Sequence, residues 1–118
     1  MPVYLCFLDF RKAFDTVPRK LLFYKLAAMG IKRKILRAIE DLYTNTNATV
    51  RVGRHESQSF EIESGVTQGS KLGPLLFIIC MNDLLIELEK LGLGIKIGNM
   101  SASALSFADD IMLITDSL

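Results

Sequence analysis

The apolar and polar positions in the first half of the chain follow two different patterns. Residues 3–8 form a continuous apolar stretch, which is typical of a strand buried on both faces. After Pro18, which suits the first turn of a helix, apolar residues recur at helical spacing until Gly30, a common helix stop. A second helix is predicted directly afterwards. The inward-facing residues of the first helix are Leu22, Leu26 and Met29, and those of the second are Ile35, Leu36, Ile39 and Leu42.

A hairpin is predicted after the second helix. Val50 and Val52 alternate with polar residues, and so do Phe60 and Ile62. This period of two indicates a pair of half-buried strands, joined across residues 53–57.

The remaining part of the chain predicts a loop, a long helix and further strands. A polar, glycine-rich loop covers residues 64–73, and Pro74 opens the longest helix, which ends near Gly92. The strands that follow are expected around residues 95–97, 104–107 and 111–114. This order of elements predicts an α+β domain in which helices pack on one face of an antiparallel sheet.

Length and composition favour one folded globular unit. The chain has 118 residues, of which 50% are hydrophobic and 23% charged, so it is expected to bury a core rather than remain disordered. The net charge of +1 conceals an uneven distribution: basic residues dominate residues 11–37, where Asp15 is the one acid, and acids outnumber bases from Ala38 onward. This asymmetry is typical of a face that contacts a polyanion, but lysines that merely solvate two helices explain it equally well.

The cysteines and the apolar stretches indicate a soluble intracellular protein. Cys6 and Cys80 both stand in apolar runs and are expected to be small core residues in a reducing compartment. The apolar residues 3–8 are too short for a signal peptide. The run 75–81 falls well short of the roughly 20 residues that a membrane span needs.

The acidic pair Asp109-Asp110 stands between two apolar segments. Adjacent aspartates suit a tight hairpin turn, because their side chains bond nearby backbone amides. Asp9 favours another interpretation, since it ends the first strand, Phe10 continues the apolar pattern, and an acid in such a place is costly unless its charge is matched. If the first strand pairs beside the hairpin that carries Asp109 and Asp110, three carboxylates meet at one end of the sheet.

Such a group of like charges is expected to bind divalent cations. Hard oxygen ligands without a nearby His or Cys favour Mg²⁺ or Mn²⁺ over zinc. Two such ions activate the attacking oxygen and stabilise the leaving oxygen in phosphoryl transfer. The sequence therefore predicts a two-metal centre.

Three segments, in this order, resemble the reverse transcriptases of non-LTR retrotransposons. Residues 8–17 (Leu-Asp-Phe-Arg-Lys-Ala-Phe-Asp-Thr-Val) resemble motif A, residues 65–77 (Gly-Val-Thr-Gln-Gly-Ser-Lys-Leu-Gly-Pro-Leu-Leu-Phe) resemble motif B, and residues 107–110 (Phe-Ala-Asp-Asp) resemble motif C. The last motif alone is a weak signal, whereas three ordered motifs are specific. The resemblance spans nearly the whole chain and implies the palm of an RNA-directed DNA polymerase.

This resemblance assigns expected roles to individual residues. It implies that Asp9 and Asp109 bind both metal ions, that Asp110 assists, and that the backbone carbonyl of Phe10 adds a ligand. Phe14 corresponds to the aromatic gate that blocks a ribose 2′-hydroxyl and so selects deoxynucleotides, although an ordinary core Phe is the alternative.

Further roles concern the nucleotide and the nucleic acid. Gln68 and Gly69 are expected to line the incoming nucleotide and the template base, and Asp15 is expected to cap the following helix. The residues whose charge suits contact with nucleic-acid phosphates are Lys32, Arg33, Lys34, Arg37 and Lys71.

Two departures from the family pattern stand out. The broader motif B reads Gln-Gly-x-Pro-x-Ser-Pro, and here Lys71 and Gly73 replace the first Pro and the Ser. The chain also begins on motif A and ends just after motif C, so residues 1–118 are expected to form a partial domain whose fingers and thumb are missing. Because positioning supplies much of the catalytic power in phosphoryl transfer, the isolated chain is expected to show little or no polymerase activity.

The resemblance implies an RNA template, a DNA primer and dNTPs as partners, in the cytoplasm and nucleus. RNA-dependent RNA polymerases usually carry Gly before the acidic pair and an acid where Phe14 stands, so both Ala108 and Phe14 favour DNA synthesis. A group II intron maturase is nearer, but residues 12–17 are more like the retrotransposon group. The alternative of a different class is a truncated or co-opted remnant that binds RNA or protein without catalysis.

Overall fold

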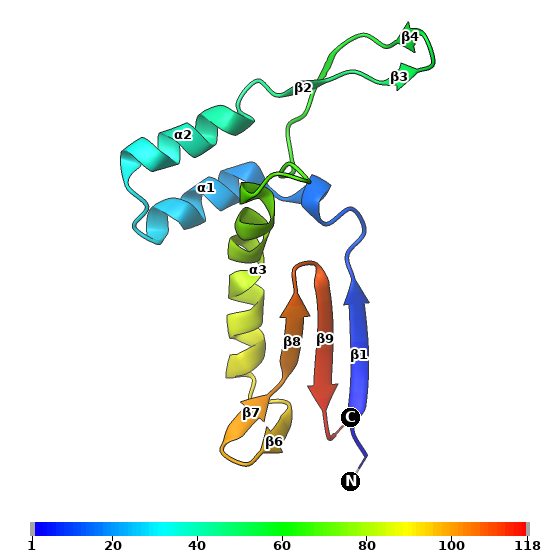
Figure 1. Cartoon of the computed structure of the whole chain (residues 1–118). Coiled ribbons are helices and arrows are strands. Elements are labelled where there is room, and N and C mark those ends of the chain that lie inside the picture. The colour runs from blue at the N-terminus through cyan, green and yellow to red at the C-terminus, as the bar shows by residue number, and fades with distance from the viewer. Residues whose placement is uncertain (1, 118) are drawn as a thin grey trace.

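The computed structural model describes residues 2–117 and contains one three-stranded sheet, three α-helices and small hairpins (Figure 1). In chain order, the elements are β1 (Tyr4–Asp9), the 3₁₀ turn η1 (Phe14–Thr16), α1 (Arg19–Ala28), α2 (Arg33–Tyr43), β2 (Asn47–Ala48), β3 (Arg51–Val52), β4 (His55–Glu56), β5 (Phe60–Glu61), α3 (Leu72–Lys90), β6 (Ile95–Ile97), β7 (Met100–Ala102), β8 (Ala104–Phe107) and β9 (Asp110–Thr115). The predicted α+β class is confirmed.

The main sheet has the order β1-β9-β8, and both pairs are antiparallel. The central strand β9 buries Ile111 and Ile114. Strand β1 was predicted to be buried on both faces, and this is wrong: as an edge strand it is exposed along its whole length, including Cys6. A continuous apolar run cannot show how many neighbouring layers cover a strand, so the prediction failed at this point.

Helix α1 begins and ends close to the predicted positions, but its N-cap residue is not the predicted one. Leu22 and Leu26 are buried, whereas Met29 is exposed. The amides of Gly30 and Ile31 bond the carbonyls of Ala27 and Leu26, which is the Schellman arrangement that glycine favours at a helix end.

Asp15 does not cap this helix, contrary to the prediction. It lies inside η1, and the N-cap position belongs to Pro18, which makes no side-chain capping bond within the described chain.

Helix α2 turns inward two of the four residues predicted to face the core, Leu36 and Ile39. Ile39 and Tyr43 are buried and Leu36 is partly buried, so the inward stripe follows the spacing of three and four residues. Ile35 and Leu42 were expected to face the core and are instead exposed. Both faces of this helix carry apolar residues, so the sequence pattern alone did not distinguish them.

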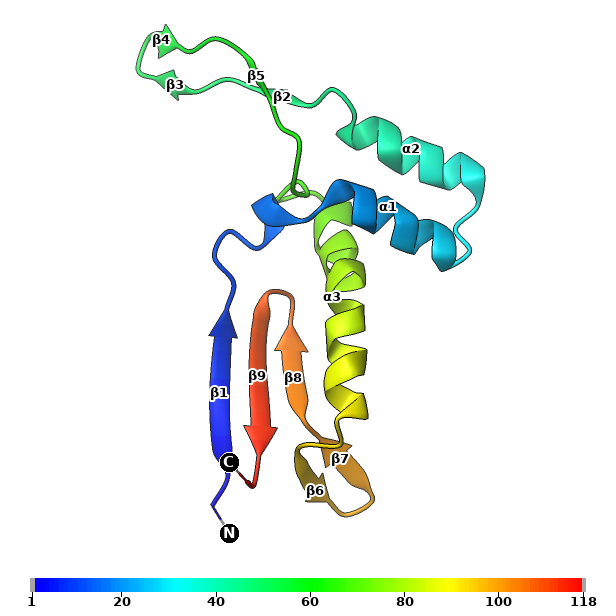
Figure 2. The same ribbon diagram turned by 180° about the vertical axis from the view of Figure 1, so that it is seen from behind.

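A hairpin forms in the predicted segment and projects away from the body of the molecule, but the strand at residues 51–52 pairs with residues 55–56 and not with the strand around Phe60 as predicted (Figures 1 and 2). We call residues 46–62 the arm. Strand β2 pairs with β5 and β3 with β4, and the amide of Ile62 bonds the carbonyl of Thr46 at the base. Val50, Val52 and Phe60 are exposed, so the prediction of half-buried strands is wrong.

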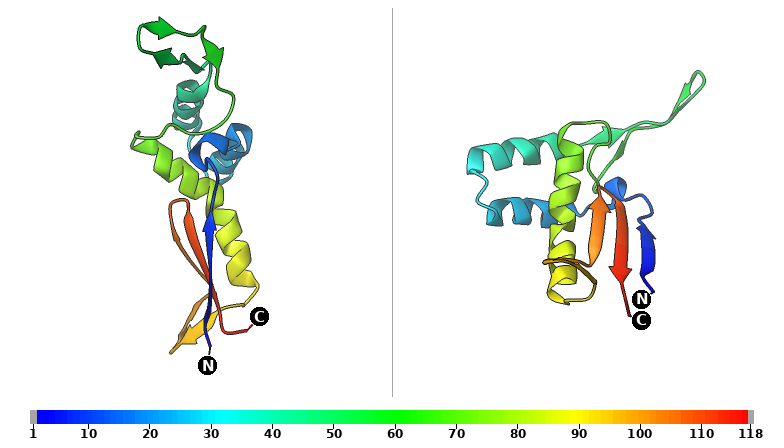
Figure 3. Two further views of the ribbon diagram at one scale, coloured as in Figure 1. Left: turned by 90° about the vertical axis from the view of Figure 1, so that its right-hand side faces the viewer. Right: turned by 60° about the horizontal axis from the view of Figure 1, so that its bottom comes forward.

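The core lies where α1, α2 and the start of α3 meet. Helix α1 packs on both α2 and α3, and α3 also contacts β8 (Figure 3). The buried members of this core are Ala13, Val17, Leu22, Leu26, Ile39, Tyr43, Val66, Leu76 and Phe77.

The molecule is extended for its size. Its radius of gyration is 18.4 Å, whereas a compact domain of this length is expected near ~13–14 Å. None of the helices within residues 2–117 is long and apolar enough to cross a membrane. The start of β1 and the end of β9 lie side by side at the same end of the sheet (Figure 1).

Gly73 provides a test of this architecture, because alanine normally stabilises a helix relative to glycine. Here a Cβ would lie 2.2 Å from the carbonyl oxygen of Thr67, so we expect Gly73→Ala to lower the free energy of unfolding by about 2–3 kcal/mol. Gly53→Ala is the control: it has open space but a φ of +62°, and should cost about 1 kcal/mol. Urea unfolding measures both, and a stabilised Gly73→Ala variant would contradict the packing described.

Candidate active site

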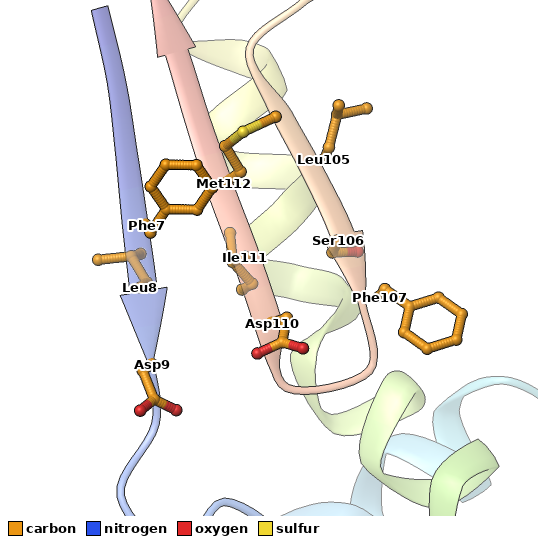
Figure 4. A pocket seen from close by; sticks show the side chains of 9 residues that line it. All are labelled: Phe7, Leu8, Asp9, Leu105, Ser106, Phe107, Asp110, Ile111 and Met112. Carbon is orange, nitrogen blue, oxygen red and sulfur yellow. The ribbon is translucent and has the colours of Figure 1, made fainter.

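Asp9 and Asp110 lie directly opposite each other on neighbouring strands. Asp9 is the last residue of β1, Asp110 is the first of β9, and the two are register partners. Partners in an antiparallel pair point to the same face, and Figure 4 shows both carboxylates at the same end of the sheet. We call these two residues the carboxylate pair. Both are exposed, and like charges in this position destabilise the sheet unless a cation neutralises them.

Asp109 occupies the adjoining hairpin turn. Strands β8 and β9 are joined by the two residues Ala108 and Asp109, and Ala108 has a φ of +54°, which costs a residue with a Cβ about 1–2 kcal/mol. Asp109 is half-buried and does not line the cavity beside the carboxylate pair. The structure therefore brings two of the three predicted carboxylates together and places the third one residue away.

The carboxylate pair stands at the end of an open, mostly apolar cavity of about 470 Å³ (Figure 4). Its apolar floor comes from side chains that share one face of the sheet, and three of them are largely exposed. These are Phe7 (74% exposed), Leu105 (55%) and Phe107 (83%). The cavity thus combines exposed rings and acids on a single surface.

Residues 14–17, which belong to the motif A segment, are joined to the loop that precedes α3. We call residues 64–71 the glycine loop. The amide of Val66 donates to the carbonyl of Phe14 at 2.8 Å, and the amide of Gly65 donates to the carbonyl of Val17 at 2.9 Å. The hydroxyl of Ser64 also donates to the carbonyl of Asp15 at 3.0 Å. Gly65 needs its glycine here, because its φ is +88° and a Cβ would lie 2.7 Å from the backbone of Asp15.

The three residues expected to contact a nucleotide lie around this junction. The ring of Phe14 stacks on that of Phe77, with centroids 4.8 Å apart, so it packs against the core as the alternative interpretation stated. Gln68 is exposed, and its Nε2 lies 3.5 Å from Oδ1 of Asp15. Gly69 is exposed with a φ of +79° and open space around its Cα. Selection of deoxynucleotides by Phe14 stays a prediction.

Phe10, whose carbonyl is expected to bind metal, follows the end of β1 directly. Its side chain is half-buried and packs against the core, so the chain leaves the sheet immediately beyond Asp9. Among the described residues 2–117, no group of three or more His, Cys, Asp or Glu side chains converges closely enough to hold a metal ion. Two carboxylates and a neighbouring backbone carbonyl are therefore the donor set available at this place.

The basic residues divide into two groups. All five residues predicted to contact nucleic acid are exposed, and none forms a salt bridge within the described part of the chain. Arg19 and Lys25, by contrast, turn inward. Nζ of Lys25 donates to the carbonyl of Cys80 at 2.6 Å and pairs with Asp83 at 3.0 Å, which ties α1 to α3. No pattern in the sequence separates these two residues from the other bases.

An antiparallel sheet that presents paired aspartates beside a glycine loop and a long helix is the arrangement of a polymerase palm. Residues 2–118 match the family model described as reverse transcriptase (RNA-dependent DNA polymerase), and the chain belongs to this family.

The chain is similar to proteins of the retrotransposable element R2 and of the mobile element jockey. It is 36% identical over 112 residues to a Retrovirus-related Pol polyprotein from type-1 retrotransposable element R2 of Popillia japonica, covering 93% of this chain and 16% of the relative. It is 31% identical to the corresponding R2DM polyprotein of Drosophila melanogaster (97% and 11%) and 31% identical to the RNA-directed DNA polymerase from mobile element jockey of Drosophila funebris (95% and 12%). The chain thus spans less than a fifth of the length of these relatives.

The opposition of Asp9 and Asp110 gives a stability prediction. In the absence of divalent cations, Asp110→Asn should raise the free energy of unfolding by about 0.2–1 kcal/mol, because it removes a like-charge pair. The gain should shrink in about 1 M salt, where screening acts over ~3 Å. Glu63→Gln, at an exposed acid without a register partner, is the control. Urea unfolding with EDTA measures both; a destabilised Asp110→Asn variant would show that the two charges do not repel.

Proposed function

We propose that the chain supplies the catalytic palm of an RNA-directed DNA polymerase from a non-LTR retrotransposon. The reaction joins a dNTP to a primer 3′-hydroxyl on an RNA template. The observation that carries this proposal is the register of β1 with β9, which sets Asp9 opposite Asp110. Nothing in the sheet itself benefits from two facing carboxylates, so their placement is best explained by a cationic ligand.

The donor set at this place suits Mg²⁺ or Mn²⁺. Carboxylate and carbonyl oxygens are hard ligands, and the exposed position of the carboxylate pair allows a partly hydrated ion to bind. The family resemblance assigns both ions to Asp9 and Asp109, with Asp110 assisting and the carbonyl of Phe10 as a further ligand; of these acids, Asp9 and Asp110 already face each other, and Asp109 adjoins them in the turn. Two such ions would activate the primer hydroxyl and stabilise the leaving pyrophosphate. The chain's own contribution is to hold the acids on a strand end and a two-residue turn, so that little reorganisation is needed.

The incoming nucleotide is assigned to the junction of residues 14–17 with the glycine loop. Packing of Phe14 on Phe77 fixes the ring, and a fixed ring can exclude a 2′-hydroxyl where a mobile ring could not. Gln68 and Gly69 lie on the same loop, where the open backbone of Gly69 permits close approach to a base.

The nucleic-acid duplex is assigned to the exposed bases outside the carboxylate pair. Lys32, Arg33, Lys34 and Arg37 lie at the start of α2, and Lys71 precedes α3. Three of these cations, Lys32, Arg33 and Lys34, lie at the N-cap and in the first turn of α2, where they oppose the helix dipole, so a polyanion would stabilise them. The remaining contacts would come from fingers and thumb regions of a longer polyprotein, acting in the cytoplasm and nucleus.

Metal binding tests the first step of this proposal. We expect Mn²⁺, followed by the paramagnetic resonance signal of the free ion, to bind the 118-residue chain and to lose about tenfold or more in affinity in Asp9→Asn, because the site loses one of its charged ligands. Glu63→Gln, remote from the carboxylate pair, should bind like the unmodified chain. Equal affinity of Asp9→Asn and the unmodified chain would overturn the metal assignment.

Primer extension tests the scope of the activity. With Mg²⁺, dNTPs and a primed RNA template, we expect little or no product from this chain alone, because it spans less than a fifth of its relatives' length and positioning supplies much of the catalytic power in phosphoryl transfer. Clear extension that is lost in Asp109→Ala would establish the polymerase and show that this segment suffices. A non-catalytic remnant would be favoured instead by two results together: the chain binds no Mn²⁺, and it binds RNA without metal even as the Asp9→Asn variant.

A further inference from the structure

The guanidinium of Arg19 binds three separate segments of the chain. Its Nε donates to the carbonyl of Gly65 at 2.9 Å. Its Nη1 lies 2.8 Å from the carbonyl of Tyr43, 2.9 Å from the hydroxyl of Thr46 and 2.6 Å from the carbonyl of Ile62. The group also lies 5.2 Å from the centroid of the Tyr43 ring. One side chain therefore connects the end of α2, both strands at the base of the arm, and the glycine loop.

These contacts suit arginine and no other residue. The guanidinium presents donors in a fixed planar fork, so it can serve acceptors in several directions at once. Lysine has a single nitrogen on a flexible stem and cannot reach the carbonyl of Gly65 and that of Tyr43 in the same geometry. Charge-assisted bonds of this type are stronger than bonds between neutral groups.

The hydrogen bonds of Arg19 reach the part of the glycine loop that also contacts residues 14–17. Gly65 is held from one side by the carbonyl of Val17 and from the other by Nε of Arg19. Val66, next along the chain, is buried and bonds the carbonyl of Phe14. Without the Arg19 side chain, the carbonyl of Gly65 would lose its hydrogen bond. The glycine loop would then be joined to residues 14–17 only by the backbone bonds of Gly65 and Val66 and the hydroxyl of Ser64. Gln68 and Gly69 follow directly after this anchored pair.

We propose that Arg19 is a positioning residue: it fixes the glycine loop against Phe14, and so sets the geometry of the nucleotide pocket formed by Phe14, Gln68 and Gly69. It also couples the direction of the arm to this pocket, because the same guanidinium holds the base of the arm. The inference about the pocket rests on the proposed function, whereas the anchoring of the loop does not.

Amide hydrogen exchange on the 118-residue chain tests the anchoring. In Arg19→Ala and in Arg19→Lys, we expect the amides of Gly65 and Val66 to exchange about tenfold faster or more, the scale of one lost charge-assisted hydrogen bond. Amides in the middle of α1 and α3 should keep their protection. Lys20→Ala is the matched control, since Lys20 is the exposed neighbour of Arg19. Unchanged exchange at Gly65 and Val66 in Arg19→Ala would overturn the proposal.

Nucleotide binding tests the consequence for the pocket. We expect NMR shifts of the Gln68 side-chain amide on adding Mg²⁺-dATP, and about tenfold weaker binding in Arg19→Ala with a smaller preference for dATP over ATP. Millimolar methylguanidinium should restore part of this affinity to Arg19→Ala and none to Lys20→Ala, which general destabilisation would not produce. Binding of dATP that is equal in the unmodified chain and in Arg19→Ala would refute the role in the pocket.

The two measurements separate two failures. If the unmodified chain binds Mn²⁺ but no nucleotide, and Arg19→Ala still speeds exchange at Val66, the nucleotide assignment fails and the anchoring stands. If exchange is unaffected while nucleotide binds normally, the proposed function stands and the inference about Arg19 fails.

Discussion

The arrangement of the whole molecule depends on two backbone hydrogen bonds, from the amides of Gly65 and Val66 to the carbonyls of Val17 and Phe14. They join two segments almost fifty residues apart in the chain, directly before α1 and shortly before α3. With these bonds in place, α1 and α3 must start at neighbouring points and can pack on each other. Glycine at position 65 is a requirement of this contact, because any Cβ would enter the backbone of Asp15. The glycine and the buried Val66 therefore serve the fold first, and the proposed pocket uses the rigidity that results.

The second constraint is the register of the sheet. Since side chains alternate between the faces of a strand, a slip of one residue between β1 and β9 would move Asp110 to the opposite face from Asp9. The apolar residues of β9 and the two-residue turn at Ala108 both oppose such a slip. Strain at Ala108 follows from the short turn, which keeps Asp109 next to the carboxylate pair. The strand pairing and the packing of β9 therefore offset two costs, the strain at Ala108 and the repulsion between the facing acids.

Sequence reasoning succeeded where information was local and failed where it depended on distant partners. The helices, the arm and the final hairpin were predicted because periodicity, glycines and prolines act over a few residues. The burial of β1, and that of Ile35 and Leu42 on α2, were predicted wrongly, because both depend on which other segments cover them. Arg19 was indistinguishable from Lys20 in a run of bases, although one is a structural centre and the other is exposed. The meeting of the acids was predicted on the condition that the first strand pairs beside the final hairpin; β1 does pair with β9, and this sets Asp9 opposite Asp110, with Asp109 in the adjoining turn.

The same surface that carries the carboxylate pair also exposes Phe7 and Phe107. Facing acids and solvent-exposed aromatic rings both lower the free energy of unfolding, which is already small for a domain of this size. On the proposed function, each cost would be removed by a ligand: cations would relieve the acids, and the nucleic-acid duplex would cover the rings. A ligand that binds only the folded state adds stability in proportion to the logarithm of its concentration. On the proposed function, the palm is therefore least stable when empty, and its metal ions and duplex act as parts of its fold as well as of its chemistry.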